Sequence, residues 1–111
     1  MSLPGGPHFQ RIFKRCREIE QAIEDTPSTI DLRVSYEPEL KLCVEIETSD
    51  HLALVEGWER GRCLDVTVMN KKTTASAILS AGQCKGDEDV DLRIEQLCQT
   101  IGIPVSFARF K

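Results

Sequence analysis

Two neighbouring segments of the chain alternate between apolar and polar side chains at every second position. In residues 30–36 and 40–46 the apolar positions are Ile30, Leu32, Val34, Tyr36, Leu40, Leu42, Val44 and Ile46. A period of two is typical of a strand with one buried face, and the intervening Glu37-Pro38-Glu39 suits a turn. The sequence therefore predicts a β-hairpin in which the series from Leu40 to Ile46 faces the core.

Further strands are expected after this hairpin. Residues 51–58 and 62–69 are rich in apolar side chains, and Glu59-Arg60-Gly61 between them offers a glycine for a turn. A weaker strand of small side chains covers residues 74–81. Because each connection is short, consecutive strands should pair antiparallel and form a meander.

Amphipathic helices are predicted on both sides of the strands. Apolar residues recur at spacings of three and four in residues 9–23 and again in residues 87–101, where acidic residues open the helix and Gly102 ends it. The expected fold class is α+β, an antiparallel four- to five-stranded sheet (meander) with N-terminal and C-terminal helices packed on one face. We expect residues 1–8 to be a flexible leader and residues 9–111 to form a single α+β domain. The sequence leaves undecided whether a short strand follows Pro104.

Charge and composition disfavour several function classes. The formal net charge is −4 and the pI is about 5.2, which argues against a nucleic-acid partner. No apolar run is long enough to span a bilayer, and the start lacks the features of a secretory leader. The five cysteines contain no C-x-x-C pair, which favours reduced thiols over a disulfide framework or a metal site. We therefore expect a cytoplasmic protein with no cofactor, no metal and no membrane partner.

Residues with catalytic potential are sparse. The only two histidines are His8, in the expected leader, and His51, at a turn. The serines lack a G-x-S-x-G elbow, and neither a G-x-G-x-x-G nor a phosphate-binding loop pattern occurs. The sequence thus predicts no catalytic residues and a non-enzymatic protein. A small hydrolase or transferase is the less favoured alternative, and it would require a pocket with convergent titratable groups.

Acidic residues are concentrated in the centre of the chain. Between Glu37 and Glu59 there are seven acids against the single base Lys41. A solvated outer face of the sheet would explain them. The functional interpretation is a binding surface for a protein partner with a basic cleft.

The pairing of the strands decides which residues would form that surface. We expect a register that aligns Val44 with Leu54 and Val68, so that the other face of the sheet combines apolar side chains with an acidic rim. The predicted partner-binding residues are Glu45, Glu47, Ala53, Val55, Asp65 and Met69. The same register turns Glu56 inward, and a β-bulge at Gly57 is expected to relieve it. A helix covering this face is the alternative.

The first helix carries its charges in an order that its macrodipole does not favour. Bases occupy its early positions and acids its late ones; the bases are Arg11, Lys14, Arg15 and Arg17. A solvated helix face is the simplest explanation. The alternative is that the basic end contacts an acidic partner or the acidic strands of a second copy, which leaves a homodimer open.

The segment Trp58-Glu59-Arg60-Gly61-Arg62-Cys63-Leu64-Asp65-Val66, with the strand and acidic-capped helix after it, resembles small immunity proteins of bacterial polymorphic-toxin systems. It looks most like the TriTu group, cognate antidotes of ADP-ribosyltransferase toxins, over roughly residues 40 to 102. The resemblance implies a cytoplasmic toxin inhibitor that occludes the catalytic cleft of its toxin. A secretion chaperone, which would bind an unfolded effector segment, is the main alternative, and the neighbouring genes would discriminate between the two.

Overall fold

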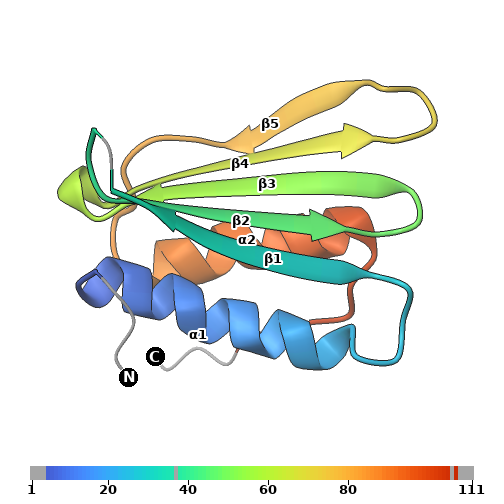
Figure 1. Ribbon diagram of the computed structural model, residues 1–111, viewed down its shortest axis with the longest axis horizontal. Helices are drawn as coiled ribbons and strands as arrows, with labels where there is room; N and C mark the ends of the chain where they lie inside the picture. Colours follow the sequence, from blue (N-terminus) through green and yellow to red (C-terminus); the bar gives the residue numbers. More distant parts are fainter. Residues whose placement is uncertain (1–4, 37, 106, 108–111) are drawn as a thin grey trace.

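The computed structural model describes residues 5–36, 38–105 and 107, and it shows one five-stranded antiparallel sheet with two helices (Figure 1). In chain order the elements are α1 (Pro7–Ala22), β1 (Thr29–Ser35), β2 (Lys41–Glu47), β3 (His51–Trp58), a short 3-10 turn η1 (Arg60–Arg62), β4 (Cys63–Asn70), β5 (Ser76–Ser80) and α2 (Asp87–Ile101). Neighbours in the sheet are neighbours in the chain, in the order β1-β2-β3-β4-β5. The predicted α+β meander is confirmed.

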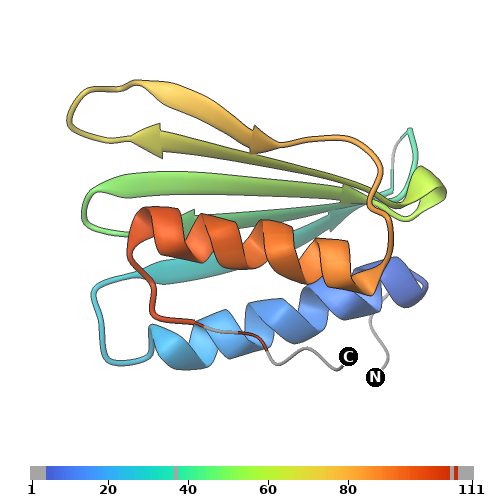
Figure 2. The same cartoon turned by 180° about the vertical axis from the view of Figure 1, so that it is seen from behind.

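Both helices lie on the same face of the sheet (Figures 1 and 2). The side chains of β2 that point to this inner face, Leu42, Val44 and Ile46, are buried, as the alternation predicted. They pack with the apolar stripes of both helices, which include Phe9 and Leu97. Burial of these surfaces is the main favourable contribution to folding.

The first helix begins at Pro7, where a proline is favoured because the first helical position has no intrahelical partner for an N–H group. The carboxylate of Glu59, between β3 and η1, accepts hydrogen bonds from the backbone N–H groups of Gly6, His8 and Phe9 at 2.6, 3.2 and 3.1 Å. His8 is buried, and its Nε2 lies 3.0 Å from the carbonyl oxygen of Cys63. The prediction of a flexible leader is therefore wrong for residues 7 and 8, while residues 1–4 lie outside the described residues.

The two helices are joined by a buried ion cluster. The Asp91 carboxylate of α2 accepts bidentate hydrogen bonds from Arg15, at 2.8 and 2.7 Å, and from Arg11, at 2.9 and 2.6 Å. Arg15 and Asp91 are 2% and 0% exposed, and Arg15 also contacts Glu18 and the ring of Phe107. Two of the bases expected on a solvated or partner-binding helix face thus point into the protein.

The segments on either side of α2 are held by side chains of that helix. Arg93 donates hydrogen bonds to the carbonyl oxygens of Leu64, Gly82 and Gln83, which fixes the connection from β5. The Glu95 carboxylate accepts a hydrogen bond from the N–H of Phe107 at 3.0 Å. No strand is assigned to residues 102–105 or 107, and the remaining positions of the optional terminal strand lie outside the described residues.

Candidate partner-binding surface

The register of the sheet differs by one residue from the expected one. Val44 lies opposite Val55, and Val55 lies opposite Val66. The β2–β3 turn sets this pairing: the N–H of Thr48 donates to the carbonyl of His51 at 2.9 Å, and the N–H of His51 donates to Thr48 Oγ1 at 3.0 Å. These contacts leave a two-residue turn, whereas the predicted register needs a longer loop.

A shift of one residue exchanges the two faces of a strand. Ala53 and Val55, predicted to contact a partner, are therefore buried under the helices, and this prediction is wrong. Four of the predicted site residues lie on the outer face, the side of the sheet that neither helix covers: Glu45, Glu47, Asp65 and Met69. The neighbours Leu52 and Leu54 take the place of Ala53 and Val55.

The outer face has an apolar centre toward the β5 side. Leu52 lies opposite Met69, and Leu54 lies in a cross-strand row with Thr67 and Ile78. Leu52, Leu54 and Met69 are half-buried, whereas Ile78 is 72% exposed. We call these four residues, Leu52, Leu54, Met69 and Ile78, the outer-face patch. A group of adjacent apolar side chains on a sheet face that no described helix covers is typical of a binding surface.

Charged side chains border the patch toward β1 and β2. Glu45 is exposed and lies directly opposite Leu54, and Glu47 lies opposite Leu52. The Glu47 carboxylate forms an ion pair with Lys71. Asp65, farther along β4, accepts a hydrogen bond from the N–H of Gly82 at 3.0 Å. Glu45, Glu47 and Asp65 therefore lie on the expected face, whereas the apolar centre keeps only Met69 of the predicted residues and gains Leu52, Leu54 and Ile78.

Glu56 also lies on the outer face, as expected, but the observed register places it there rather than a β-bulge. It forms an ion pair with Lys41, whose ammonium group lies 5.4 Å from the centroid of the Trp58 ring. The predicted bulge at Gly57 is absent, because Gly57 pairs regularly with Leu42 and Leu64. A Cβ atom at Gly57 would lie 3.0 Å from Ile12 Cδ1, so the glycine serves the close approach of α1.

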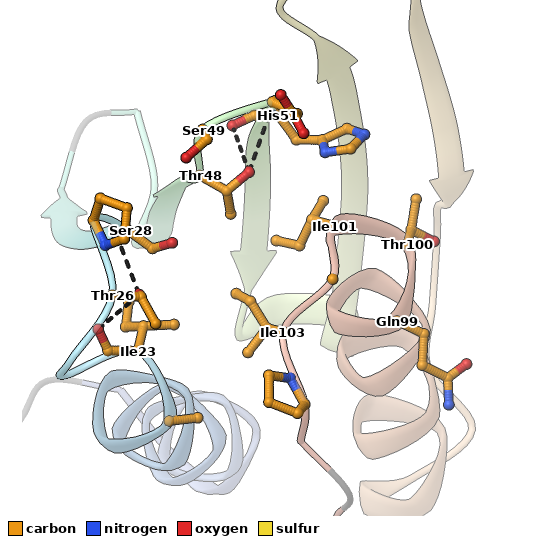
Figure 3. A pocket seen from close by; sticks show the side chains of 15 residues that line it. Ile23, Thr26, Ser28, Thr48, Ser49, His51, Gln99, Thr100, Ile101 and Ile103 are labelled. Carbon is orange, nitrogen blue, oxygen red and sulfur yellow. Dashed lines mark hydrogen bonds between the residues drawn. The ribbon is translucent and has the colours of Figure 1, made fainter.

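A hollow of about 440 Å³, lined by both polar and apolar side chains, lies at the end of the molecule where α1, the β2–β3 turn and the end of α2 meet (Figure 3). Two of its hydroxyl groups, those of Thr26 and Thr48, already serve the local turns. Thr26 Oγ1 donates to the carbonyl of Ile23 at 2.9 Å and accepts from the N–H of Ser28, and Thr48 Oγ1 accepts from His51. The one imidazole that lines it, His51, shows no pairing with a carboxylate in the described contacts. Among the described contacts of the hollow, none joins a hydroxyl oxygen to the His51 ring.

Three of the five thiols are poorly suited to nucleophilic chemistry, because they are buried. All five cysteines are free, and Cys16, Cys84 and Cys98 are buried. Burial raises the pKa of Cys16 and Cys98 to about 12 and that of Cys84 to about 11, so these thiols are protonated near neutral pH. Within the described part of the chain, no three His, Cys, Asp or Glu side chains cluster as metal ligands.

Comparisons with known proteins add no assignment: no protein-family model, curated protein or solved structure matches this chain. Among the described helices, none is both long and apolar enough to cross a membrane. The outer-face patch with its acidic rim is therefore the surface from which a function can be argued.

Proposed function

We propose that this chain is a non-enzymatic binding protein whose partner is another protein that docks on the outer face of the sheet. The observation that carries the proposal is the outer-face patch, which stays open on a sheet whose other face is covered by both helices. An apolar centre with a charged border is the common anatomy of a protein interface.

The charges next to the patch favour a basic partner. Glu45 and Glu47 lie opposite Leu54 and Leu52, and the protein as a whole carries a formal net charge of −4. Acidic side chains at the border of an interface accelerate encounter with a basic surface and reject acidic ones. The apolar patch would then supply the part of the contact that slows dissociation.

The most specific form of this proposal is a cytoplasmic immunity protein that occludes the catalytic cleft of a cognate toxin. The segment that resembles TriTu immunity proteins contributes directly to the outer face, because Trp58, Cys63 and Asp65 have their side chains there. A toxin that binds an anionic substrate is expected to have a basic cleft, which suits an acidic inhibitor. Occlusion requires surface complementarity and no catalytic group on the inhibitor.

The test has two steps: a search of the neighbouring genes for a toxin domain, and a measurement of the affinity of this chain for that domain. In the double variant Glu45→Lys/Leu54→Lys, like charges meet a basic partner and the apolar centre is lost. We expect the dissociation constant, measured by calorimetry, to rise at least about 100-fold, which corresponds to roughly 3 kcal/mol. The double variant should also fail to inhibit the toxin at concentrations at which the unaltered chain inhibits it.

A matched control changes the net charge by the same amount on the other side of the molecule. Glu24 and Gln96 are exposed residues on the helix side, and Glu24→Lys/Gln96→Lys should leave toxin binding unchanged. Equal affinities of the two double variants would place the interface elsewhere and reject the proposal. Recovery of the chain with an unfolded effector segment, and no affinity for a toxin, would favour a secretion chaperone instead.

A further inference from the structure

The two edges of the sheet differ in how they are protected against pairing with another strand. At the β1 edge, Asp31 and Arg33 form an exposed ion pair on the outer face. At the β5 edge, residues 73–84 contain no charged side chain, and residues 76–78 are exposed. Charged side chains and prolines are the usual protection of an edge strand, and β5 has neither.

The backbone groups of β5 that face away from the sheet can be identified from its register. Met69 lies opposite Ser76, and the next residue, Asn70, donates its N–H to the Ala75 carbonyl at 2.9 Å. In an antiparallel ladder, hydrogen-bonded and non-hydrogen-bonded pairs alternate. Ala77 therefore bonds to β4, whereas the N–H and C=O groups of Ser76 and Ile78 point away from β4 toward the open edge.

We propose that the β5 edge pairs with the β5 edge of a second copy of this chain, antiparallel and about a two-fold axis at Ala77. In this arrangement Ser76 of each copy lies opposite Ile78 of the other, so the outward backbone groups of both residues are satisfied. A two-fold interface brings a surface against itself, so equal charges close to the axis would repel each other and an uncharged segment is favoured there. Residues 73–84 form such a segment in a chain of net charge −4.

The side chains of β5 are also compatible with pairing to a second copy of the chain. Ile78 is 72% exposed, and pairing would cover it with backbone and Ser76 of the second copy. The register shift of β5 between Val66 and Thr67 leaves Leu79 without an opposite residue, which confines regular pairing to the stretch before it. The interface is accordingly short, and the dimer should be weak and reversible. Leu54 and Glu45 stay open in the dimer, so this inference does not depend on the proposed function.

The test uses the full chain in sedimentation equilibrium from about 1 µM to about 1 mM, the range in which a short interface becomes half-formed. The unaltered protein should pass from monomer to dimer. Ile78→Pro should remain monomeric, because it removes an outward N–H while keeping the bonds of Ala77 to β4. Ser76→Pro removes the other outward N–H and provides a second variant if the first does not fold.

The matched control is Ile78→Thr, which keeps the backbone N–H and the β-branched shape. It should dimerise with an affinity within about tenfold of the unaltered chain, since main-chain pairing carries the contact. Thermal unfolding of each variant should show a folded protein. A chain that stays monomeric at every concentration, a dimer that survives in a folded Pro variant, or equal loss of the dimer in Ile78→Thr and Ile78→Pro would each overturn the proposal.

Discussion

The two faces of the sheet are built by the same five strands, and they differ in what covers them. On the inner face, Val44, Val55 and Val66 form a row that the helices bury almost completely. On the outer face, neither helix covers the adjacent row from Leu54 through Thr67 to Ile78, and no other described segment is packed on it. The inner face thus contributes to stability through burial, whereas the outer face leaves apolar surface available for a contact with another molecule.

The largest difference in stability between variants on the two faces is expected when a charge is introduced at the centre of β2. Val44→Asp removes a fully buried side chain and places a carboxylate among apolar groups. We expect the free energy of unfolding to fall by at least about 4 kcal/mol, the combined cost of lost burial and of an unpaired charge. Urea unfolding followed by circular dichroism measures this change.

The matched variant is Cys43→Asp, which introduces the same carboxylate one residue away on the outer face. It should cost about 1 kcal/mol, because water, Lys41 and the opposite Arg33 offset the repulsion from Glu56, which lies on the other neighbouring strand. Similar losses at both positions would show that the two faces are not separated by burial as described.

The second prediction concerns the layer that covers the inner face. Asp91→Asn leaves the guanidinium groups of Arg11 and Arg15 without their carboxylate, and breaking a buried ion pair typically costs about 3 kcal/mol or more. Equilibrium urea unfolding at pH 7 measures the loss. Asp31→Asn, which breaks the exposed pair with Arg33, should change the free energy of unfolding by less than about 0.5 kcal/mol.

The same variant should change how stability depends on pH. Burial alone would raise the pKa of Asp91, but the hydrogen bonds from Arg15 and Arg11 outweigh it and lower the pKa to about 2. In an unfolded chain the pKa of Asp is about 3.9. The stabilisation by Asp91 is therefore complete above about pH 4 and is lost as the pH falls toward 2. In this window the difference between Asp91→Asn and the unaltered protein should shrink, whereas a constant difference would contradict this role of the carboxylate.

A smaller effect is expected where the sheet supports α1. Glu59→Gln weakens three hydrogen bonds at the start of the helix, and we expect a loss of about 1 to 2 kcal/mol. Glu56→Gln, three residues earlier on the outer face, breaks only the partly exposed pair with Lys41 and should cost less than about 0.5 kcal/mol. Denaturant midpoints of the two variants in parallel compare them, and equal losses would contradict a capping role for Glu59.

The alternation of β2 predicted its buried face because polar residues separate the apolar ones, and the two helices followed from their spacing in the same way. The face of β3 could not be predicted by this signal. Its residues 52–55 are all apolar, so a period of two fits either orientation. The orientation is decided by the turn from Thr48 to His51, whose side-chain and backbone hydrogen bonds fix the pairing with β2.

Long-range contacts of charged residues could not be predicted from the sequence either. Arg15 and Asp91 are 76 positions apart, and each occupies a helix position where a solvated charge is the ordinary expectation. Glu59 lies 50 or more positions from the N–H groups that it caps. Such pairs form only after the helices dock, so neither helical periodicity nor local capping patterns indicate them.

The smallest effect on stability should come from the centre of the outer-face patch. Leu54→Thr keeps a side chain that favours strands and removes only half-buried apolar surface, so the free energy of unfolding should change by less than about 1 kcal/mol. Val55→Thr, at the next position, places a hydroxyl under the helices and should cost about 1 to 3 kcal/mol, although Val and Thr have nearly the same shape. Chemical denaturation with a common slope gives both values. If Leu54→Thr costs as much as Val55→Thr, then Leu54 belongs to the stabilising core and the outer-face patch is not a free surface. If only Val55→Thr is costly, the folded monomer does not need an apolar side chain at position 54 for its stability. Contact with a bound partner can then explain why a leucine stands there.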